Sequence, residues 1–514
     1  MSSSNERVLL LKAEALVDQG AVYRQSGRPG EARQAFVEGL DIYEELNDFS
    51  GQTVALNHLG ILEYMGGKLE SAFDRFLCAK DIAMRLGDHS RAAFALGNMG
   101  LIQSDLGDPN EAAAWHHEAL EIHTEEQNLR GMALETGNLG LLSMARGDLD
   151  TAEDFLRQAL DAFVAVGDVY GAGNAVNSMG ELMRTRGDHR GARRSFEHAL
   201  ELFTKDDVHE ARIMALQNIG NLDRIAGNLD DASEAFEEAL VVAEQERLPR
   251  AEGAALTNLG NVQLAHGKRD AARSFYNRSL AIHEQMGFVE GLAGDFSNMG
   301  NVEMEDGNLL EAIECYSTAR AHFDQLGHAK GAARGGAQLG QLYLQLGRIN
   351  DAAACFEQGL ELSEKSGDKT GMALHRGGMA SLEFARGRFK DAAALLQVAE
   401  SEFSQSGNAR ARASALHALA EVQSWQGALD SARKAAREAR AFFASHEFPV
   451  GAADAACTLS KIAYLEADLE TARALVAEAC ELYQKHKVPL GTATAKNLLG
   501  LISAESGDLE VAIG

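Results

Sequence analysis

The sequence predicts an all-α protein, a solenoid of stacked, antiparallel helix hairpins. Three observations predict this fold: a repeat of forty residues, two amphipathic helical patterns in each repeat, and prolines that stand only between those patterns. With 514 residues the chain is too long for one ordinary core. A repeat array accommodates such a length because its core grows lengthwise.

The repeat is visible as three series of small residues at a fixed phase. A first glycine recurs at intervals of forty residues or multiples of forty, with Ala380, Ala420 and Ser460 at the same phase: Gly20, Gly60, Gly100, Gly140, Gly180, Gly220, Gly260, Gly300, Gly340 and Gly500. Seven residues later comes a second glycine, replaced only by Ala467: Gly27, Gly67, Gly107, Gly147, Gly187, Gly227, Gly267, Gly307, Gly347, Gly387, Gly427 and Gly507. Five residues further on, every repeat has an alanine: Ala32, Ala72, Ala112, Ala152, Ala192, Ala232, Ala272, Ala312, Ala352, Ala392, Ala432, Ala472 and Ala512. This register predicts twelve complete repeats and part of a thirteenth.

Each repeat contains two amphipathic helices around a glycine turn, because apolar residues recur every three or four positions on both sides of it. The second glycine is predicted to close the first helix in a left-handed conformation. Aspartates that follow it are predicted N-caps of the second helix: Asp108, Asp148, Asp188 and Asp508. The prolines fall within the turns and avoid helix interiors: Pro29, Pro109, Pro249, Pro449 and Pro489.

The alanine series has a packing reason. Two helices approach closely only where a side chain at their crossing is small, and a larger residue there costs about 1 to 3 kcal/mol. Large residues are predicted to fill the groove four positions further on: Phe36, Phe76, Phe196, Phe236, Tyr276, Tyr316 and Phe356.

The combination of Gly220, Ala232, Phe236 and Ala239 resembles the tetratricopeptide repeat. The resemblance covers essentially the whole chain and implies a right-handed superhelix. The period of forty residues departs from the usual 34, and the customary tyrosine and closing proline are mostly absent. The chain is similar in this respect to the long-repeat subfamily of Pins-type adaptors, and the extra residues are expected to lengthen the helices around the turn between repeats.

Three segments are predicted along the chain. Residues 1–5 are expected to be disordered, residues 6–373 to form nine repeats, and residues 374–514 to form divergent repeats that end in an incomplete hairpin. A hairpin that stops at VAIG would leave an apolar face uncovered. We expect a truncated chain, a domain of a longer protein, or an end that associates with another chain.

The charge balance excludes several classes of partner. Lys and Arg number 48 against 76 Asp and Glu, a net charge of -28, which argues against nucleic acid and anionic membranes and favours a neutral or basic protein partner. No apolar run is long enough to insert in a membrane, and the N-terminal sequence lacks the features of a signal peptide. The five cysteines include no CxxC pair. The sequence therefore predicts a cytoplasmic protein with buried thiols.

The resemblance implies that the first helix of each repeat lines the concave face, where asparagines contact the main chain of an extended ligand. The matching residues form a ladder before and after the first glycine: Asn98, Asn138, Asn218, Asn221, Asn258, Asn261, Asn298 and Asn301. An amide offers both a donor and an acceptor to a peptide group. The alternative is that these asparagines bond neighbouring helices and hold the stack together. Arg184 and Arg224 lie one turn further on and could bind a ligand carboxylate or pair with acids such as Glu181.

No other motif predicts chemistry. His116, His123 and His283 occupy the phases of core aromatic residues, which favours packed histidines over metal ligands. The GAGNAV segment at Gly171 imitates a dinucleotide fingerprint but follows no strand. We therefore expect no catalysis, cofactor or metal, and predict a scaffold or adaptor that binds an extended peptide segment. The alternative is a sensor region that controls an effector domain in a larger signalling protein.

Overall fold

The computed structural model describes residues 3–26, 28–446, 448–486 and 488–506, and within these ranges it consists of helices and short turns. The chain divides into two compact units, residues 1–255 and 256–514, with the division inside α13 (Pro249–Ala265). Unit 1 contains α1 (Ser3–Gln25), α2 (Pro29–Leu46), α3 (Phe49–Met65), α4 (Leu69–Leu86), α5 (His89–Asp105), α6 (Pro109–Glu125), α7 (Leu129–Arg146), α8 (Leu149–Ala165), α9 (Val169–Thr185), α10 (His189–Lys205), α11 (His209–Ala226) and α12 (Leu229–Gln245). Unit 2 contains α14 (Arg269–Met286), α15 (Val289–Asp306), α16 (Leu309–Gln325), α17 (Ala329–Gln345), α18 (Ile349–Lys365), α19 (Lys369–Ala385), α20 (Phe389–Gln405), α21 (Ala409–Trp425), α22 (Leu429–Ser445), α23 (Pro449–Leu465), α24 (Leu469–Lys485) and α25 (Pro489–Glu505).

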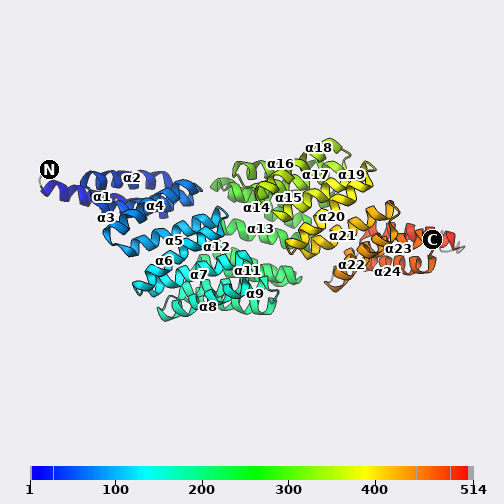
Figure 1. Ribbon diagram of the computed structural model, residues 1–514, viewed down its shortest axis with the longest axis horizontal. Helices are drawn as coiled ribbons and strands as arrows, with labels where there is room; N and C mark the ends of the chain where they lie inside the picture. The colour runs from blue at the N-terminus through cyan, green and yellow to red at the C-terminus, as the bar shows by residue number, and fades with distance from the viewer. Residues whose placement is uncertain (1–2, 27, 447, 487, 507–514) are drawn as a thin grey trace. The chain divides into compact units, whose positions relative to one another are not determined.

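Helices that follow one another in the chain pack side by side as hairpins, and each hairpin packs on the next within its unit (Figure 1). The predicted all-α solenoid is therefore confirmed. Apart from α1, the helices are 17 or 18 residues long, and turns of two or three residues join them. The forty-residue period is thus two nearly equal helices with minimal connections.

The turns confirm the predicted caps. Gly147 closes α7 with a φ of 81°, and the other second glycines of the described residues also have positive φ. Ala467, the one replacement in this series, adopts the same left-handed conformation with a φ of 61°. Asp148 accepts a hydrogen bond from the Thr151 amide at the start of α8, and Asp108 and Asp188 cap α6 and α10 in the same way. Gly27, Gly507 and Asp508 lie outside the described residues.

The small-residue phases lie at helix crossings, as predicted. Every alanine of the series from Ala32 to Ala472 is fully buried, whereas Ala512 lies outside the described residues. The first glycine makes room for the aromatic ring, because a Cβ at Gly220 would lie 2.7 Å from the Phe236 ring. Where alanine replaces this glycine the ring is lost as well, since Ala380 shares its core cluster with Leu396.

Of the predicted segment ends, the structure describes the residues near the N-terminus but not those at the C-terminus. Helix α1 begins at Ser3, inside the segment for which the sequence predicts disorder. The predicted incomplete hairpin at the end of residues 374–514 begins with α25, and its last part, residues 507–514, lies outside the described residues. No helix in the described part of the chain combines the length and the hydropathy that crossing a membrane requires.

Candidate functional site

The first helices of the repeats are the odd-numbered helices, and they lie next to one another. In unit 1, α1 contacts α3, α3 contacts α5, and α7 contacts α9. In unit 2, α17 contacts α19, and α23 contacts both α21 and α25. The exposed positions of these helices therefore form a surface of their own in each unit, which we call the first-helix face.

Two ladder asparagines of unit 1 bond within the protein. Asn98 donates from Nδ2 to the carbonyl oxygen of Phe94, one turn earlier in α5, at 2.8 Å. Asn218 on α11 donates from Nδ2 to Oδ1 of the buried Asn177 on α9, at 2.9 Å. The bond between Asn218 and Asn177 joins adjacent repeats, which is the structural role that the sequence left open.

Two ladder asparagines of unit 2 are also engaged. The Asn261 Oδ1 accepts a hydrogen bond from the Tyr276 hydroxyl at 2.8 Å. The Asn301 Oδ1 accepts one from the Tyr316 hydroxyl at 2.6 Å. Both tyrosines are buried groove-filling residues. These two asparagines therefore satisfy the hydroxyl groups of core tyrosines.

The remaining four asparagines of the ladder are half-buried, and their side-chain amides make no hydrogen bond with other described residues: Asn138, Asn221, Asn258 and Asn298. Asn138 and Asn221 belong to unit 1, and Asn258 and Asn298 to unit 2. Their amides are the ones that a ligand could bind without breaking an internal bond.

The two arginines behave differently. Arg184 donates from Nε and Nη2 to the Glu181 carboxylate at 3.0 and 2.6 Å, one of the two alternatives that the sequence left open. Arg224 is exposed and forms no ion pair within the described ranges. Arg184 and Glu181 are half-buried side chains that water still reaches, and such a pair contributes little to stability, so the guanidinium can exchange partners at low cost.

The sequence analysis missed an apolar stripe on the first-helix face of unit 1. Each of Asn98 and Asn138 has an apolar residue four positions before it and three positions after it, and all four residues are at least 36% exposed: Phe94, Leu101, Leu134 and Leu141. Such spacing places each set on one side of its helix. Helices α5 and α7 also approach closely, because a Cβ at Gly97 would lie 2.5 Å from Oε1 of Glu135. Comparing exposed phases between repeats would have revealed the stripe.

Buried histidines occupy the core phases that the sequence assigns to them. His116 is 1% exposed, and its Nδ1 lies 2.6 Å from Oε2 of Glu135. His283 is also buried, with Nδ1 2.7 Å from Oδ2 of Asp295. The partner acids were missed, although the signal was present. Glu135 and Asp295 share a phase at which most repeats have alanine.

The geometry of these clusters fits a role in packing and does not fit catalysis. Ser279 and Asp295 both approach Nδ1 of His283, at 3.4 and 2.7 Å. A base that activates a serine must instead bind its orienting acid through the opposite ring nitrogen. Burial raises the pKa of the Cys315 and Cys457 thiols to about 11, which leaves little thiolate at neutral pH. No group of three or more potential metal ligands occurs among the described residues.

The tetratricopeptide repeat family profile matches four stretches, residues 52–125, 131–205, 211–285 and 296–365, and a second tetratricopeptide repeat profile matches residues 337–407. The chain belongs to the tetratricopeptide repeat family. Its divergent repeats beyond residue 407 retain the same hairpins and buried alanines. No curated protein matches the chain.

Several solved tetratricopeptide and related structures are similar to parts of the chain. BtubC (BKLC) from P. vanneervenii is 22% identical over 43% of this chain and 91% of its own, with a TM-score of 0.38. A tetratricopeptide repeat protein from Parabacteroides merdae is 20% identical over 56% of this chain and 98% of its own, with a TM-score of 0.40. A signal transduction ATPase with numerous domains from Pyrococcus horikoshii, which has a tetratricopeptide repeat sensor, is 12% identical. That match covers 72% of this chain and 52% of the other, with a TM-score of 0.47.

Proposed function

We propose that this chain is a non-enzymatic scaffold that holds an extended segment of a partner protein on its first-helix face. The observation that carries the proposal is the pair of free amides in unit 1. Asn138 and Asn221 lie half-buried on first helices and make no hydrogen bond with the described residues. Asparagine is a poor helix former and is found mid-helix here without an internal partner. Contact with peptide groups of a ligand supplies a reason for it.

The apolar stripe defines the neighbouring part of the same surface. Leu134 and Leu141 flank Asn138 on α7 and are 51% and 47% exposed. Contiguous exposed apolar side chains mark interaction sites on soluble proteins. A segment that places apolar side chains on this stripe and a main-chain amide at Asn138 therefore fits α5 and α7. The same asparagine phases support the resemblance to Pins-type adaptors.

The charge of the chain supports a neutral or basic segment. The net charge of -28 attracts cationic partners and repels acidic ones over about 10 Å at moderate ionic strength. Arg184 and Arg224 add local positive charge to α9 and α11. They suit a carboxylate, such as an isolated acidic side chain, within a segment that is otherwise basic.

The test is a selection of binding peptides from a displayed random library, followed by measurement of Kd by fluorescence anisotropy. The double variant Asn138→Ala, Asn221→Ala should weaken the selected peptides about 5- to 150-fold, because two hydrogen bonds contribute about 1 to 3 kcal/mol. The matched control is Asn110→Ala, since Asn110 is exposed on the second helix α6. Equal affinity of the double variant, the control and the wild type would refute the amide-based site.

A further inference from the structure

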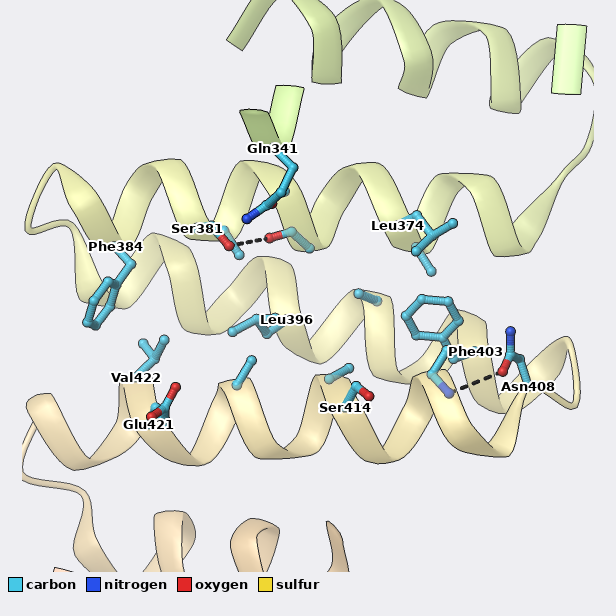
Figure 2. Close-up of a pocket in the computed structure, with 18 of the residues that line it drawn as sticks. Gln341, Leu374, Ser381, Phe384, Leu396, Phe403, Asn408, Ser414, Glu421 and Val422 are labelled. Atoms are coloured by element: carbon cyan, nitrogen blue, oxygen red, sulfur yellow. Dashed lines mark hydrogen bonds between the residues drawn. The ribbon is translucent and has the colours of Figure 1, made fainter. Parts of the chain in front are cut away.

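A cavity of about 780 Å³ opens on the first-helix face of unit 2, between α19 and α21. Its floor is α20, whose Leu396 and Phe403 lie between the two first helices in Figure 2. Its wall on α19 runs from Leu374 to Phe384, ten helical steps or about 15 Å at the rise of an α-helix. We call this cavity the α19–α21 slot.

The slot exists because both first helices carry small residues at phases that are larger in other repeats. Gly378 and Ala418 stand where the ladder has asparagine. Ser381 and Ser414 are exposed and stand at the phases of Leu141 and Leu134. Without these side chains the groove-filling residues of α20 form the floor of an open cavity.

The lining of the slot is mostly apolar and, away from the helix ends, offers no free main chain. Leu396 and Phe403 supply the floor, and Leu374 and Phe384 stand at the two ends of one wall (Figure 2). Between their first and last turns the walls and floor are α-helical, so the backbone groups there are already paired. An extended peptide would bury its own amide groups here without partners, at a considerable cost. An apolar molecule without a peptide backbone fits better.

At the Phe384 end, the slot has a charged residue in its lining. Glu421 lines the slot from α21, and Gln341 contributes to the lining from α17, where its amide lies beside Ser381 (Figure 2). The nearest cation to the Glu421 carboxylate is Lys461, whose Nζ lies 4.0 Å from Oε1, a weak contact. Arg410 lines the opposite end, where its guanidinium lies 4.5 Å above the Phe448 ring. The Phe384 end of the slot is therefore acidic and able to accept hydrogen bonds.

We propose that the α19–α21 slot binds an elongated, apolar small molecule with one cationic, hydrogen-bond-donating head group. The apolar body lies along α20, and the head group binds Glu421. A concave, mostly apolar site of this volume with a few polar groups at one end has the typical anatomy of a small-molecule site. The site is separate from the peptide face proposed for unit 1 and does not depend on it.

The experiment titrates the full chain with hexylamine, octylamine, octan-1-ol and octanoate by isothermal calorimetry, below the concentrations at which they aggregate. Octylamine should bind at one site, and about 15-fold more tightly than hexylamine, because each added methylene contributes about fourfold. Octan-1-ol should bind more weakly than octylamine, and octanoate most weakly. Octanoate that binds as tightly as octylamine, or titrations without saturation, would overturn the proposal.

Two sets of variants locate the site. Ser381→Leu with Ser414→Phe fills the slot with residues that Leu141 and Phe94 show to be tolerated at the same phases, and should weaken octylamine at least tenfold. The matched control is Ser404→Leu, an exposed position of α20 outside the slot lining, which should bind like the wild type. Glu421→Gln should bring octylamine to the affinity of octan-1-ol. Ser381→Leu is measured alone as well, with circular dichroism as the check of folding. Unchanged octylamine binding in folded filled variants refutes the site.

Discussion

On the first-helix faces of the two units, the same repeat positions produce different surfaces: projecting apolar side chains in unit 1 and a cavity in unit 2. On α7 of unit 1, Leu134 and Leu141 project from the surface around Asn138. On α19 and α21 of unit 2, the phases of those leucines carry Ser381 and Ser414, and a cavity takes their place. Beneath both faces the alanine of every described repeat is fully buried. We infer from this difference that the small residues at helix crossings set the register of the repeats. The residue types at exposed positions of the first helices can vary without changing that register.

The cores of the two units also differ at one shared phase. Most repeats have alanine there, as at Ala95 and Ala215. Unit 1 has Glu135, paired with His116, and unit 2 has Asp295, paired with His283. Unit 2 further places His375 at this phase, buried to 1% exposure. Apart from Gly335, each exception is a buried polar residue, so each of these provides a way to probe one unit at a time.

The largest expected effect comes from separating His116 and Glu135. Glu135→Ala should destabilise the surrounding repeats by about 3 to 5 kcal/mol, because it leaves the other member of a buried pair without its partner. The double variant with His116→Phe should recover most of this loss, since it recreates the combination of Phe76 and Ala95 in the preceding repeat. Hydrogen exchange of α5 to α8, measured by mass spectrometry, reports the change.

Recovery in the double variant is the decisive outcome for that pair. Asp295→Ala serves as the matched change in unit 2, and it should increase exchange in α14 to α16 while leaving α5 to α8 protected. A double variant as unstable as Glu135→Ala would show that phenylalanine and alanine cannot substitute for His116 and Glu135 at these positions.

The second effect is a pH dependence that belongs to unit 2. Burial lowers the pKa of His375 from 6.5 to about 4, so the ring stays neutral in the folded chain. The unfolded chain takes up a proton as the pH falls below 6.5, and the folded chain does so only near pH 4. Stability is therefore lost across this window, by up to about 3 kcal/mol. Urea unfolding followed by hydrogen exchange of α19, at several pH values between 7 and 4, measures it.

His375→Ala provides the control for the pH series. It restores the alanine of Ala415 at the same phase and removes the titrating group, although it opens space beside Gly359, where the ring now lies. The variant should be less stable at pH 7 and should show a shallower decrease of stability toward pH 4. An equally steep decrease would assign the pH dependence to other groups.

The third effect tests what the units share. Ala152→Leu in unit 1 and Ala392→Leu in unit 2 should each destabilise their hairpin by about 1 to 3 kcal/mol, because both alanines are fully buried at helix crossings. The control is Ala165→Leu, at the exposed end of α8, which should leave the melting temperature unchanged. Similar losses in both units support a common register; tolerance in unit 2 alone would show that its divergent repeats pack by another rule.

The fold could be predicted from the sequence because its determinants are local and periodic. Gly147 closes a helix, and Ala152 lies at a helix crossing. Equivalent residues recur every forty positions, so both features can be found from the spacing alone. The sequence also shows that the repeat with Ala380 in place of the first glycine has Leu396 in place of the aromatic residue. The reason became clear only from the structure, in which the first glycine of other repeats packs directly against the aromatic ring.

The candidate site could be predicted only in part, because hydrogen bonds between repeats depend on side-chain reach. Asn218 and Asn138 stand at one phase, yet only Asn218 meets a partner, because Asn177 occupies the neighbouring helix. For Asn138 the corresponding residue on the neighbouring helix α5 is Gly97, which has no side chain to bond. The slot of unit 2 was not predicted from the sequence for a related reason. It arises from several small residues on two helices, and none of them is unusual when it is considered alone.

The smallest expected effect is on stability when the two faces are exchanged. Leu141→Ser in unit 1 and Ser381→Leu in unit 2 swap residues of one phase that are exposed in both units. Each should change the free energy of unfolding by no more than about 0.5 kcal/mol, because neither side chain contributes to a core. Binding should change much more. Leu141→Ser should weaken peptides that engage α7, and Ser381→Leu should weaken octylamine in α19. Thermal unfolding and the two titrations of each variant separate these outcomes. A large fall in melting temperature for either variant would contradict the inference that exposed first-helix residues do not affect the packing of the repeats.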